Sequence, residues 1–278
     1  MLDQFKERGL YTCGDSGIRY LQFLSKIPDA VCILPHWHDV MELLYLVSGR
    51  MKIYVNEVPM ELLPGQLAVF PPQTLHGALC GAPNSLYHAF LFDVERFYNG
   101  TGASEKWLKP LRQGKLSFPG VVSDPQVTEA ARQLVVLKEA GERDSMQAVG
   151  QLYILLDGLF RLSTPGSRVP SPGEESLRSV LEYIDAHYTE DLTVRRISRE
   201  FSYNETYFCR RFKKVTGLTI TEYIRILRLE LAQKLLKTEK CEIRDIAWRC
   251  GFPDESYFSR AFRLHTGMTP RQFRKQTK

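Results

Sequence analysis

The sequence predicts an α+β protein of two domains: an N-terminal antiparallel β-barrel that ends in a helical hairpin, and a C-terminal all-helical domain. Three observations predict it. Short apolar runs separated by Gly, Pro and Asn turns fill residues 18–93. Helical periodicity replaces them from about residue 124. Residues 163–175, rich in Pro, Gly and Ser, then separate residues 1–162 from a helical remainder, 176–278, and are expected to be a linker.

The chain of 278 residues is long enough for two cores, and its 44% apolar and 25% charged residues are typical of a globular protein. No apolar run reaches the roughly 18 residues that a membrane span needs, and the first residues lack the apolar segment of a signal peptide. We therefore expect a cytoplasmic protein with no membrane partner. The six cysteines show no metal-binding spacing, so we expect reduced, mostly packed thiols.

Charge is unevenly distributed along the chain. Residues 177–278 contain 21 Lys and Arg against 13 Asp and Glu, a net charge of +8, whereas the rest contains 16 against 19, a net charge of −3. A basic C-terminal third beside a slightly acidic remainder suggests that only the C-terminal domain faces a polyanion.

The expected strands lie in the runs IRYLQFL, MELLYLVSG, MKIYVN, LAVFP and LYHAFLFD, and residues 94–122 are less regular. Asp124 and Pro125 have the pattern of a helix cap followed by proline at the first helical position. Two amphipathic helices then form a hairpin over about residues 124–162. We expect this hairpin to mediate homodimerisation.

Residues 242–270 predict a helix, a tight turn and a second helix. Ile243, Ile246 and Cys250 share one face of the first helix, Gly251 is suited to end it, and Asp254 is suited to cap the second. A related segment lies about fifty residues earlier, with seven identities in the thirteen positions from 207 to 219. The sequence therefore predicts a duplicated helix-turn-helix. The aromatic residues of both copies are expected in the core: Tyr207, Phe208, Phe212, Tyr257, Phe258 and Phe262.

Between the two copies, Thr219 and Glu222 have the spacing of a capping box at the start of a helix that runs to about Leu236. Such a helix spans roughly 25 Å. A rigid spacer of this length can hold two recognition helices about 34 Å apart, one turn of B-DNA. The sequence thus offers a reason for one chain to carry both copies.

The pattern IAxxxGFxDxSYFSRxFRxxTGxTPxxFR, which starts at Ile246, closely resembles the signature of AraC/XylS-type transcription regulators. The resemblance covers about residues 176–278 and implies a seven-helix DNA-binding domain with both recognition helices in the major groove. It also implies a double-stranded DNA operator, a homodimer and RNA polymerase as partners, and no enzymatic activity.

Residue roles follow from the position of each side chain around the two helices. We expect base contacts from the groove-facing residues Thr206, Cys209, Arg210, Glu255, Ser256, Ser259 and Arg260. We expect phosphate contacts, which position without specifying, from Arg211, Lys213, Lys214, Arg228 and Arg263. The alternative for any one of these residues is a solvated charged surface.

A second cluster begins at His36-Trp37-His38 and continues with Glu42 and Gly49. This spacing resembles the first motif of the cupin β-barrel, and the second motif follows with Gly65, Pro71 and His76. The sequence departs from the pattern at Gln73, where the family usually has Gly, and at Cys80, where it often has Asn. In metal-binding cupins the residues that correspond to His36, His38, Glu42 and His76 converge inside the barrel, and this donor set suits several divalent metals.

Three interpretations of these residues stay open. The cluster binds a small effector, such as a sugar or a sugar derivative, without a metal; it binds a divalent metal; or it consists of packed core histidines. By alternation Glu42, Leu44 and Leu46 share one strand face, and Trp37 and His88 are further candidates for the lining of the site. The favoured function is a DNA-binding regulator controlled by an effector in the barrel, with no obligatory cofactor. The alternative is a metal-dependent cupin enzyme fused to a DNA-binding domain.

Overall fold

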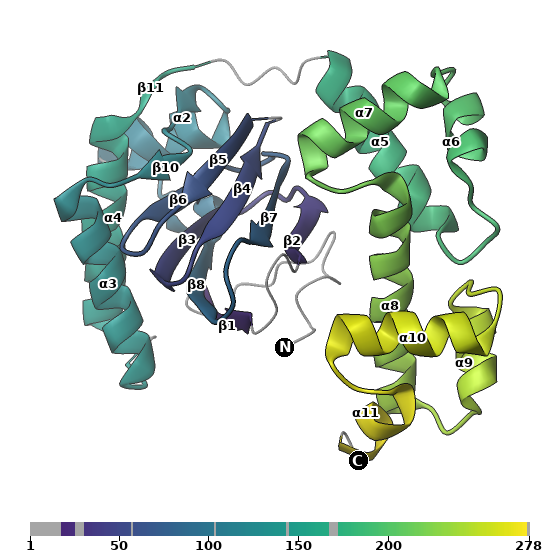
Figure 1. Ribbon diagram of the computed structural model, residues 1–278. Coiled ribbons are helices and arrows are strands. Elements are labelled where there is room, and N and C mark those ends of the chain that lie inside the picture. The colour runs from purple at the N-terminus through teal and green to yellow at the C-terminus, as the bar shows by residue number, and fades with distance from the viewer. Residues whose placement is uncertain are drawn as a thin grey trace. The chain divides into compact units, whose positions relative to one another are not determined.

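The computed structural model describes residues 18–25, 31–56, 58–102, 104–142, 145–166 and 172–276. The described chain divides into two compact units, one of residues up to 166 and one of residues from 172 (Figure 1). The predicted fold class, α+β with a barrel-like unit and a helical unit, is confirmed. Within these ranges, no helix combines the length and the apolar character needed to cross a membrane.

The N-terminal unit contains two antiparallel sheets. The five-stranded sheet has the order β1 (Ile18–Ser25), β8 (Ser85–Phe92), β3 (Met41–Ser48), β6 (Leu67–Phe70) and β10 (Val121–Val122). The four-stranded sheet has the order β2 (Val31–His36), β7 (His76–Cys80), β4 (Met51–Val55) and β5 (Val58–Leu62). Inward side chains of both sheets form one core that includes Leu44, Phe70, Tyr87, Ile53 and Ala78.

The helical hairpin covers the other face of the five-stranded sheet. Its helices are α3 (Pro125–Glu139) and α4 (Met146–Leu162), which pack against each other (Figure 1). A second core joins them to Leu43, Val69 and Phe90 of the sheet. Because β3 and β8 are covered on both faces, both read as nearly continuous apolar runs. Asp124 caps α3 as predicted, since its carboxylate accepts the N–H groups of Gln126 and Val127.

Three of the four strands in the four-stranded sheet were not among the expected runs: β2, β5 and β7. β2 and β5 form the two edges of the four-stranded sheet and contain Pro35 and Pro59, while β7 contains Gly77. Proline and glycine lower the strand signal in a sequence, although proline is tolerated at a sheet edge. β2 is positioned by pairing with β7, and both β5 and β7 are positioned by pairing with β4. The local sequence does not show these pairings.

The expectation that every cysteine is a reduced thiol is wrong for one pair. Cys32 on β2 and Cys80 on β7 form a disulfide inside the barrel core. The two strands pair through an irregular ladder with two register shifts, so the disulfide ties an edge strand to its only neighbour in the sheet. Of the described thiols, Cys250 is buried and Cys209 is exposed.

Residues between the barrel and the hairpin form short elements: α1 (Val94–Phe97), the π-helix η2 (Ser104–Leu108), α2 (Lys109–Arg112) and β9 (Leu116–Ser117). β9 pairs with β11 (Thr164–Pro165), so the first part of the expected linker belongs to the N-terminal unit. The next helix starts at Pro172, four residues before the expected boundary at 176. The segment between the two units is therefore shorter than its composition indicated.

The C-terminal unit has seven helices among the residues described (Figure 1). They are α5 (Pro172–His187), α6 (Val194–Glu200), α7 (Glu205–Thr216), α8 (Ile220–Thr238), α9 (Ile243–Arg249), α10 (Glu255–Thr266) and α11 (Pro270–Gln276). The helix-turn-helix units are α6 with α7 and α9 with α10. The predicted capping box at Thr219 and Glu222 is present at the start of α8.

Arg228 of α8, expected to contact phosphate, has a different role. Its Nε donates to the carbonyl of Tyr188 at 2.6 Å, and its Nη2 donates to the carbonyl of Glu190 at 2.8 Å. The backbone of Gly251, with φ +83°, lies against the guanidinium group of Arg228. A Cβ atom at this position would lie 2.6 Å from the carbonyl oxygen of Thr189 and 3.0 Å from Nε of Arg228. The guanidinium therefore joins the spacer helix to the segment before α6 and to the turn after α9.

We predict that Arg228→Met lowers the local stability of the C-terminal unit by about 2 kcal/mol, because two carbonyls lose charged hydrogen-bond donors at a half-buried site. Hydrogen exchange measured on the full-length protein should show faster exchange in α5 and α8. Lys234→Met, at an exposed position of the same helix, is the control and should leave exchange unchanged. Equal exchange rates in both variants would contradict the structural role of Arg228.

Candidate functional site

Four ligand-type side chains meet inside the N-terminal unit. His36 ends β2, His38 lies in the bend before β3, Glu42 lies on β3, and His76 begins β7. One donor atom from each can be chosen so that all four atoms lie within 4.8 Å of one another. Residues 40 apart in sequence are thus brought together by the pairing of β2 with β7, in which His36 lies opposite His76. This convergence was predicted by the motif spacing.

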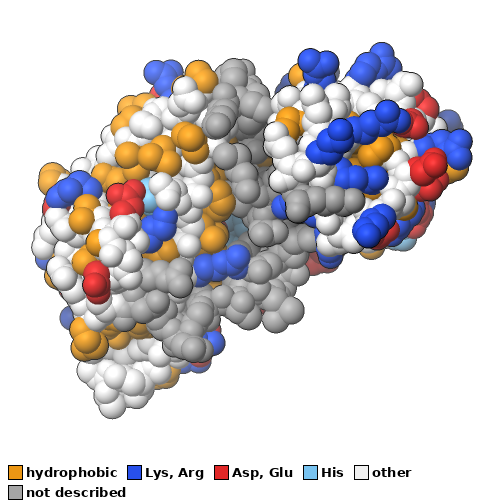
Figure 2. All heavy atoms as spheres, turned by 90° about the horizontal axis from the view of Figure 1, so that it is seen from below, with side chains coloured by type: hydrophobic (Ala, Val, Ile, Leu, Met, Phe, Trp, Pro, Cys, Tyr) orange, Lys and Arg blue, Asp and Glu red, His pale blue; other side chains and the backbone are white. Residues whose placement is uncertain are grey.

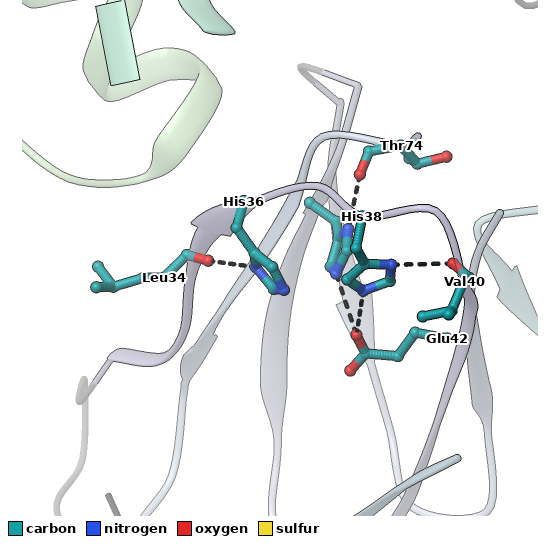
Figure 3. Close-up of polar contacts among 7 residues, drawn as sticks. Leu34, His36, His38, Val40, Glu42 and Thr74 are labelled. Atoms are coloured by element: carbon teal, nitrogen blue, oxygen red, sulfur yellow. Dashed lines mark hydrogen bonds and ion pairs between the residues drawn. The ribbon is translucent and has the colours of Figure 1, made fainter. Parts of the chain in front are cut away.

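Each imidazole of this four-residue cluster is fixed by a backbone carbonyl (Figure 3). Nδ1 of His36 lies 2.8 Å from the carbonyl oxygen of Leu34. Nδ1 of His38 lies 2.9 Å from that of Val40, and Nδ1 of His76 lies 2.8 Å from that of Thr74. A carbonyl oxygen can only accept, so Nδ1 carries the proton in each ring. In the neutral ring, the remaining Nε2 then presents a lone pair.

Nε2 of His38 and Nε2 of His76 lie 3.0 and 3.2 Å from the same carboxylate oxygen, Oε2 of Glu42. Burial would raise the pKa of Glu42, but its contacts with the two histidines lower it well below the ordinary range. Burial lowers the pKa of His76, and burial together with the neighbouring His76 and His38 lowers the pKa of His36 well below its usual value. An ionised carboxylate thus lies within hydrogen-bond distance of two imidazoles inside the unit.

The cluster is a candidate divalent metal site. It supplies three imidazole nitrogens and one carboxylate, a donor set that suits Zn, Mn, Fe, Ni or Cu. Hydrogen bonds from Nδ1 to backbone carbonyls are the outer contacts that metal-bound histidines usually make. A polar effector that forms hydrogen bonds with the same atoms is the alternative occupant of the cluster.

The cluster lies beside the apolar core of the barrel. His38, Glu42 and His76 are buried, and Phe70 stacks on His76 with ring centroids 4.4 Å apart. Leu44 and Leu46, two and four residues after Glu42 on β3, belong to the core between the sheets, as the predicted alternation requires. A few polar atoms within an apolar enclosure are typical of a small-molecule site.

His88 does not belong to this site. Its neighbour on β8, Tyr87, faces the barrel core, whereas His88 lies on the hairpin side, with Nε2 3.8 Å from Oε1 of Glu139 on α3. Burial, and then the charge of Lys138, lower the pKa of His88 to about 4. The expectation that His88 lines the effector site is therefore wrong. Trp37 is half-buried between the two histidines of the first motif.

Both departures from the cupin pattern have structural explanations. Gln73 adopts φ +60°, a left-handed conformation that favours glycine, and its N–H donates to the carbonyl of His38 at 2.6 Å. This bond fixes the bend that carries His38. Cys80, at the position that is often Asn, forms the disulfide with Cys32. The two departures, Gln73 and Cys80, therefore change the contacts of the backbone around the cluster and leave its four members in place.

In the C-terminal unit, the expected DNA-contacting residues lie on the outer faces of α7 and α10. Exposed side chains are Thr206, Cys209, Arg210, Lys213, Lys214, Ser256, Arg260 and Arg263; half-buried side chains are Arg211, Glu255 and Ser259. The opposite faces are core, with Phe208, Phe212, Phe258 and Phe262 at 2% exposure or less. Arg228, one of the expected phosphate ligands, has its donors directed into the domain.

The two tyrosines expected in the core are instead accessible. Tyr207 is 53% exposed and Tyr257 is 37% exposed. The reason is their position: they lie directly before Phe208 and Phe258, a rotation of about 100° from the buried face. The hydroxyl of Tyr207 accepts from Nη1 of Arg211 at 3.4 Å. Sequence reasoning missed these residues as surface groups because it treated all aromatic residues of the repeat alike.

The same hydrogen bonds occur in both helix-turn-helix copies. Asn204 and Asp254 cap α7 and α10 by accepting the N–H groups of Tyr207 and Tyr257. Thr216 and Thr266 donate to the carbonyls of Phe212 and Phe262, at 2.7 and 2.8 Å. Gly217 and Gly267 end the helices, both with φ +76°. The repeat inferred from sequence is thus a repeat of local structure.

Comparisons with known proteins agree with this division of the chain. The helix-turn-helix domain family matches residues 197–276, and the cupin domain family matches residues 27–82. The chain is 35% identical over 256 residues to the HTH-type transcriptional activator RhaR of Escherichia coli O139:H28, covering 86% of each protein. It is 25% identical over 250 residues to an uncharacterized HTH-type transcriptional regulator, YisR, of Bacillus subtilis, covering 85% of this chain and 86% of that protein.

Among solved structures, the chain is similar to the C-terminal domain of AraT, a response regulator from Geobacillus stearothermophilus. The identity is 31%, with 40% of this chain and 88% of that domain covered, and the TM-score is 0.36. The relatives are named as regulators or activators, and the alternative of a cupin enzyme is not favoured. The chain therefore belongs to the AraC family of transcription regulators, with a cupin-type unit before its DNA-binding helices.

Proposed function

We propose that this regulator acts in the cytoplasm as a homodimer, binds an operator through both helix-turn-helix units, and acts on RNA polymerase. A small effector that binds in the barrel controls operator occupancy by stabilising one arrangement of the protein over another. The observation that carries the DNA part is the duplicated unit, with equivalent capping hydrogen bonds and an exposed arginine at the same position of each helix, Arg210 on α7 and Arg260 on α10.

Two expected contacts to DNA can be separated experimentally. Arg260 is exposed on α10 and can bind guanine in a bidentate manner, whereas Lys214 is exposed at the end of α7 and suits a phosphate. We predict that Arg260→Ala reduces discrimination at one base pair by about 1–3 kcal/mol, and that Lys214→Ala weakens binding to all sequences alike.

The measurement is full-length protein titrated with duplexes enriched from a random library, together with single-base variants of them. The wild type should bind with steep salt dependence. Uniform weakening by both substitutions would overturn the assigned roles, and salt-insensitive binding by the wild type would overturn the operator-binding function.

For the sensor, we propose that the four-residue cluster holds a divalent metal, and that the effector binds next to it through oxygen atoms, as the hydroxyl groups of a sugar-like molecule can. Support comes from three imidazoles and a buried carboxylate whose ligand-type atoms converge within 4.8 Å of one another. When bound, the metal would supply a Lewis-acidic position for an oxygen ligand.

We predict that the full-length protein binds Co²⁺ at one site, and that Glu42→Gln and His76→Ala weaken this binding at least tenfold, since second-shell changes alone typically cost about 10–100-fold. Isothermal titration and the visible spectrum of Co²⁺ measure it. His88→Asn is the matched control, because His88 is also a buried histidine of this unit but lies outside the cluster. Equal Co²⁺ affinity in all variants would exclude the cluster as the site.

For homodimerisation, we propose the outer face of α4. It exposes Met146 at 87%, Tyr153 at 48% and Ile154 at 49%, at spacings that place them on one side of the helix. The opposite side of α4, including Leu152, Leu156 and Leu159, packs within the unit. The hairpin thus uses one face for its own core and leaves an apolar second face.

We predict that Ile154→Arg shifts the full-length protein from dimer to monomer in sedimentation velocity, because a charge would be buried in the interface without a partner. Val58→Arg is the control: Val58 is also an exposed aliphatic residue, at 55%, but lies on the edge strand β5. A wild type that is monomeric at all concentrations, or an Ile154→Arg variant that stays dimeric, would contradict this interface.

A further inference from the structure

The two helix-turn-helix units differ in charge. The first, residues 193–217, contains seven basic and two acidic residues, a net charge of +5. The second, residues 242–267, contains four basic and four acidic residues, a net charge of zero. Copies that share their core and their caps have therefore diverged in the property that governs attraction to phosphate.

Ion pairs and ring contacts increase this difference. In the second unit Arg249 forms a two-pronged ion pair with Glu239, and Arg244 lies over the ring of Trp248, 5.0 Å from its centroid. These contacts occupy two of the four arginines of that unit. In the first unit Arg196 pairs with Glu190 at 2.7 Å, but exposed basic side chains continue along both helices: Arg195, Arg199, Arg210, Lys213 and Lys214.

One side of the recognition helices shows the divergence residue by residue. On α7 this side is formed by Tyr207, Arg211 and Lys214, at positions i, i+4 and i+7. On α10 the matching positions are Tyr257, Ala261 and Leu264. Leu264 is 79% exposed, so an apolar side chain occupies the surface position at which the first copy has an ammonium group.

The space-filling view illustrates the setting. On the face shown in Figure 2, Lys and Arg side chains spread over the helical unit at the right, while hydrophobic side chains are more frequent on the N-terminal unit at the left. The distribution on this face agrees with the uneven charge of the sequence, +8 for residues 177–278 and −3 for the remainder. Within that unit, the counts above assign most of the surplus to α6 and α7.

We propose that the two units bind the operator unequally: the first unit, through phosphate contacts of α6 and α7, supplies most of the sequence-independent affinity, and the second binds stably only because the first holds the DNA. This inference rests on the proposed operator-binding function and specifies its electrostatic part. The ligand is the phosphodiester backbone of duplex DNA. The side formed by Tyr207, Arg211 and Lys214 is a phosphate-binding surface, and its counterpart at Leu264 is not.

The test exchanges the diverged residues between copies: Lys214→Leu, Leu264→Lys and the double variant. Both positions are exposed, so the substitutions should leave the fold intact. The probe is a 40-base-pair duplex of random sequence, titrated with full-length protein at several salt concentrations. Each phosphate contact contributes about 0.9 to the slope of log affinity against log salt.

Lys214→Leu should reduce the magnitude of that slope by about one, Leu264→Lys should increase it by about one, and the double variant should return it close to the wild-type value. Lys52→Leu, an exposed lysine on β4 of the other unit, is the control for net charge and should leave the slope unchanged. An unchanged slope in Lys214→Leu, or a loss of slope equal to that of Lys52→Leu, would overturn the inference while leaving operator binding intact. A wild type that does not bind the duplex would instead overturn the operator-binding function itself.

Discussion

The guanidinium group of Arg228 joins three parts of the DNA-binding unit that are distant in sequence. It donates to carbonyls at Tyr188 and Glu190, just before the first helix-turn-helix, and it lies against the backbone of Gly251, in the turn of the second. Arg228 itself belongs to α8, the 19-residue helix between the two copies. A helix of that length spans about 28 Å. Length alone does not orient the recognition helices, however. Their orientation about α8 depends on contacts such as this one, which satisfy backbone carbonyls and also exclude a side chain at position 251.

The N-terminal unit depends in the same way on backbone groups near its polar cluster. Carbonyls of Leu34, Val40 and Thr74 fix the three imidazole rings, and the N–H of Gln73 fixes the bend at His38. The cluster is therefore oriented before any ligand binds, which reduces the ordering that binding requires. Because the hairpin covers the five-stranded sheet, β3 lies between two cores. β3 carries Glu42 on its barrel face and Leu43 on its hairpin face, so a single rigid strand contacts both the proposed effector site and the core beneath the proposed dimer surface.

Much of this architecture could be predicted because its signals are local. Caps at Asp124, Asn204, Thr219 and Asp254 and the histidine spacing are all contained in short segments. The errors concern pairings between distant segments. The Cys32–Cys80 disulfide depends on the pairing of β2 with β7, and the role of Arg228 depends on the segment after α5, at Tyr188 and Glu190, lying against α8. His88 shows a limit of the alternation pattern. The pattern predicts that His88 and Tyr87 point to opposite faces of β8, but a strand buried on both faces does not reveal which face lines the barrel.

The matched threonine and glycine residues at the ends of α7 and α10 have a consequence for how such a regulator changes over generations. Thr216 and Thr266 make the same bonds, and Gly217 and Gly267 have the same φ, although the surfaces beside them now differ in charge. The buried Phe208, Phe212, Phe258 and Phe262 are the same in both copies, whereas the exposed Lys214 corresponds to Leu264. Because these exposed side chains contribute little to the shared core, each copy can acquire new surface residues without a compensating change in the other. Divergence of a binding preference then needs only single substitutions in one copy, while the other continues to hold its part of the operator.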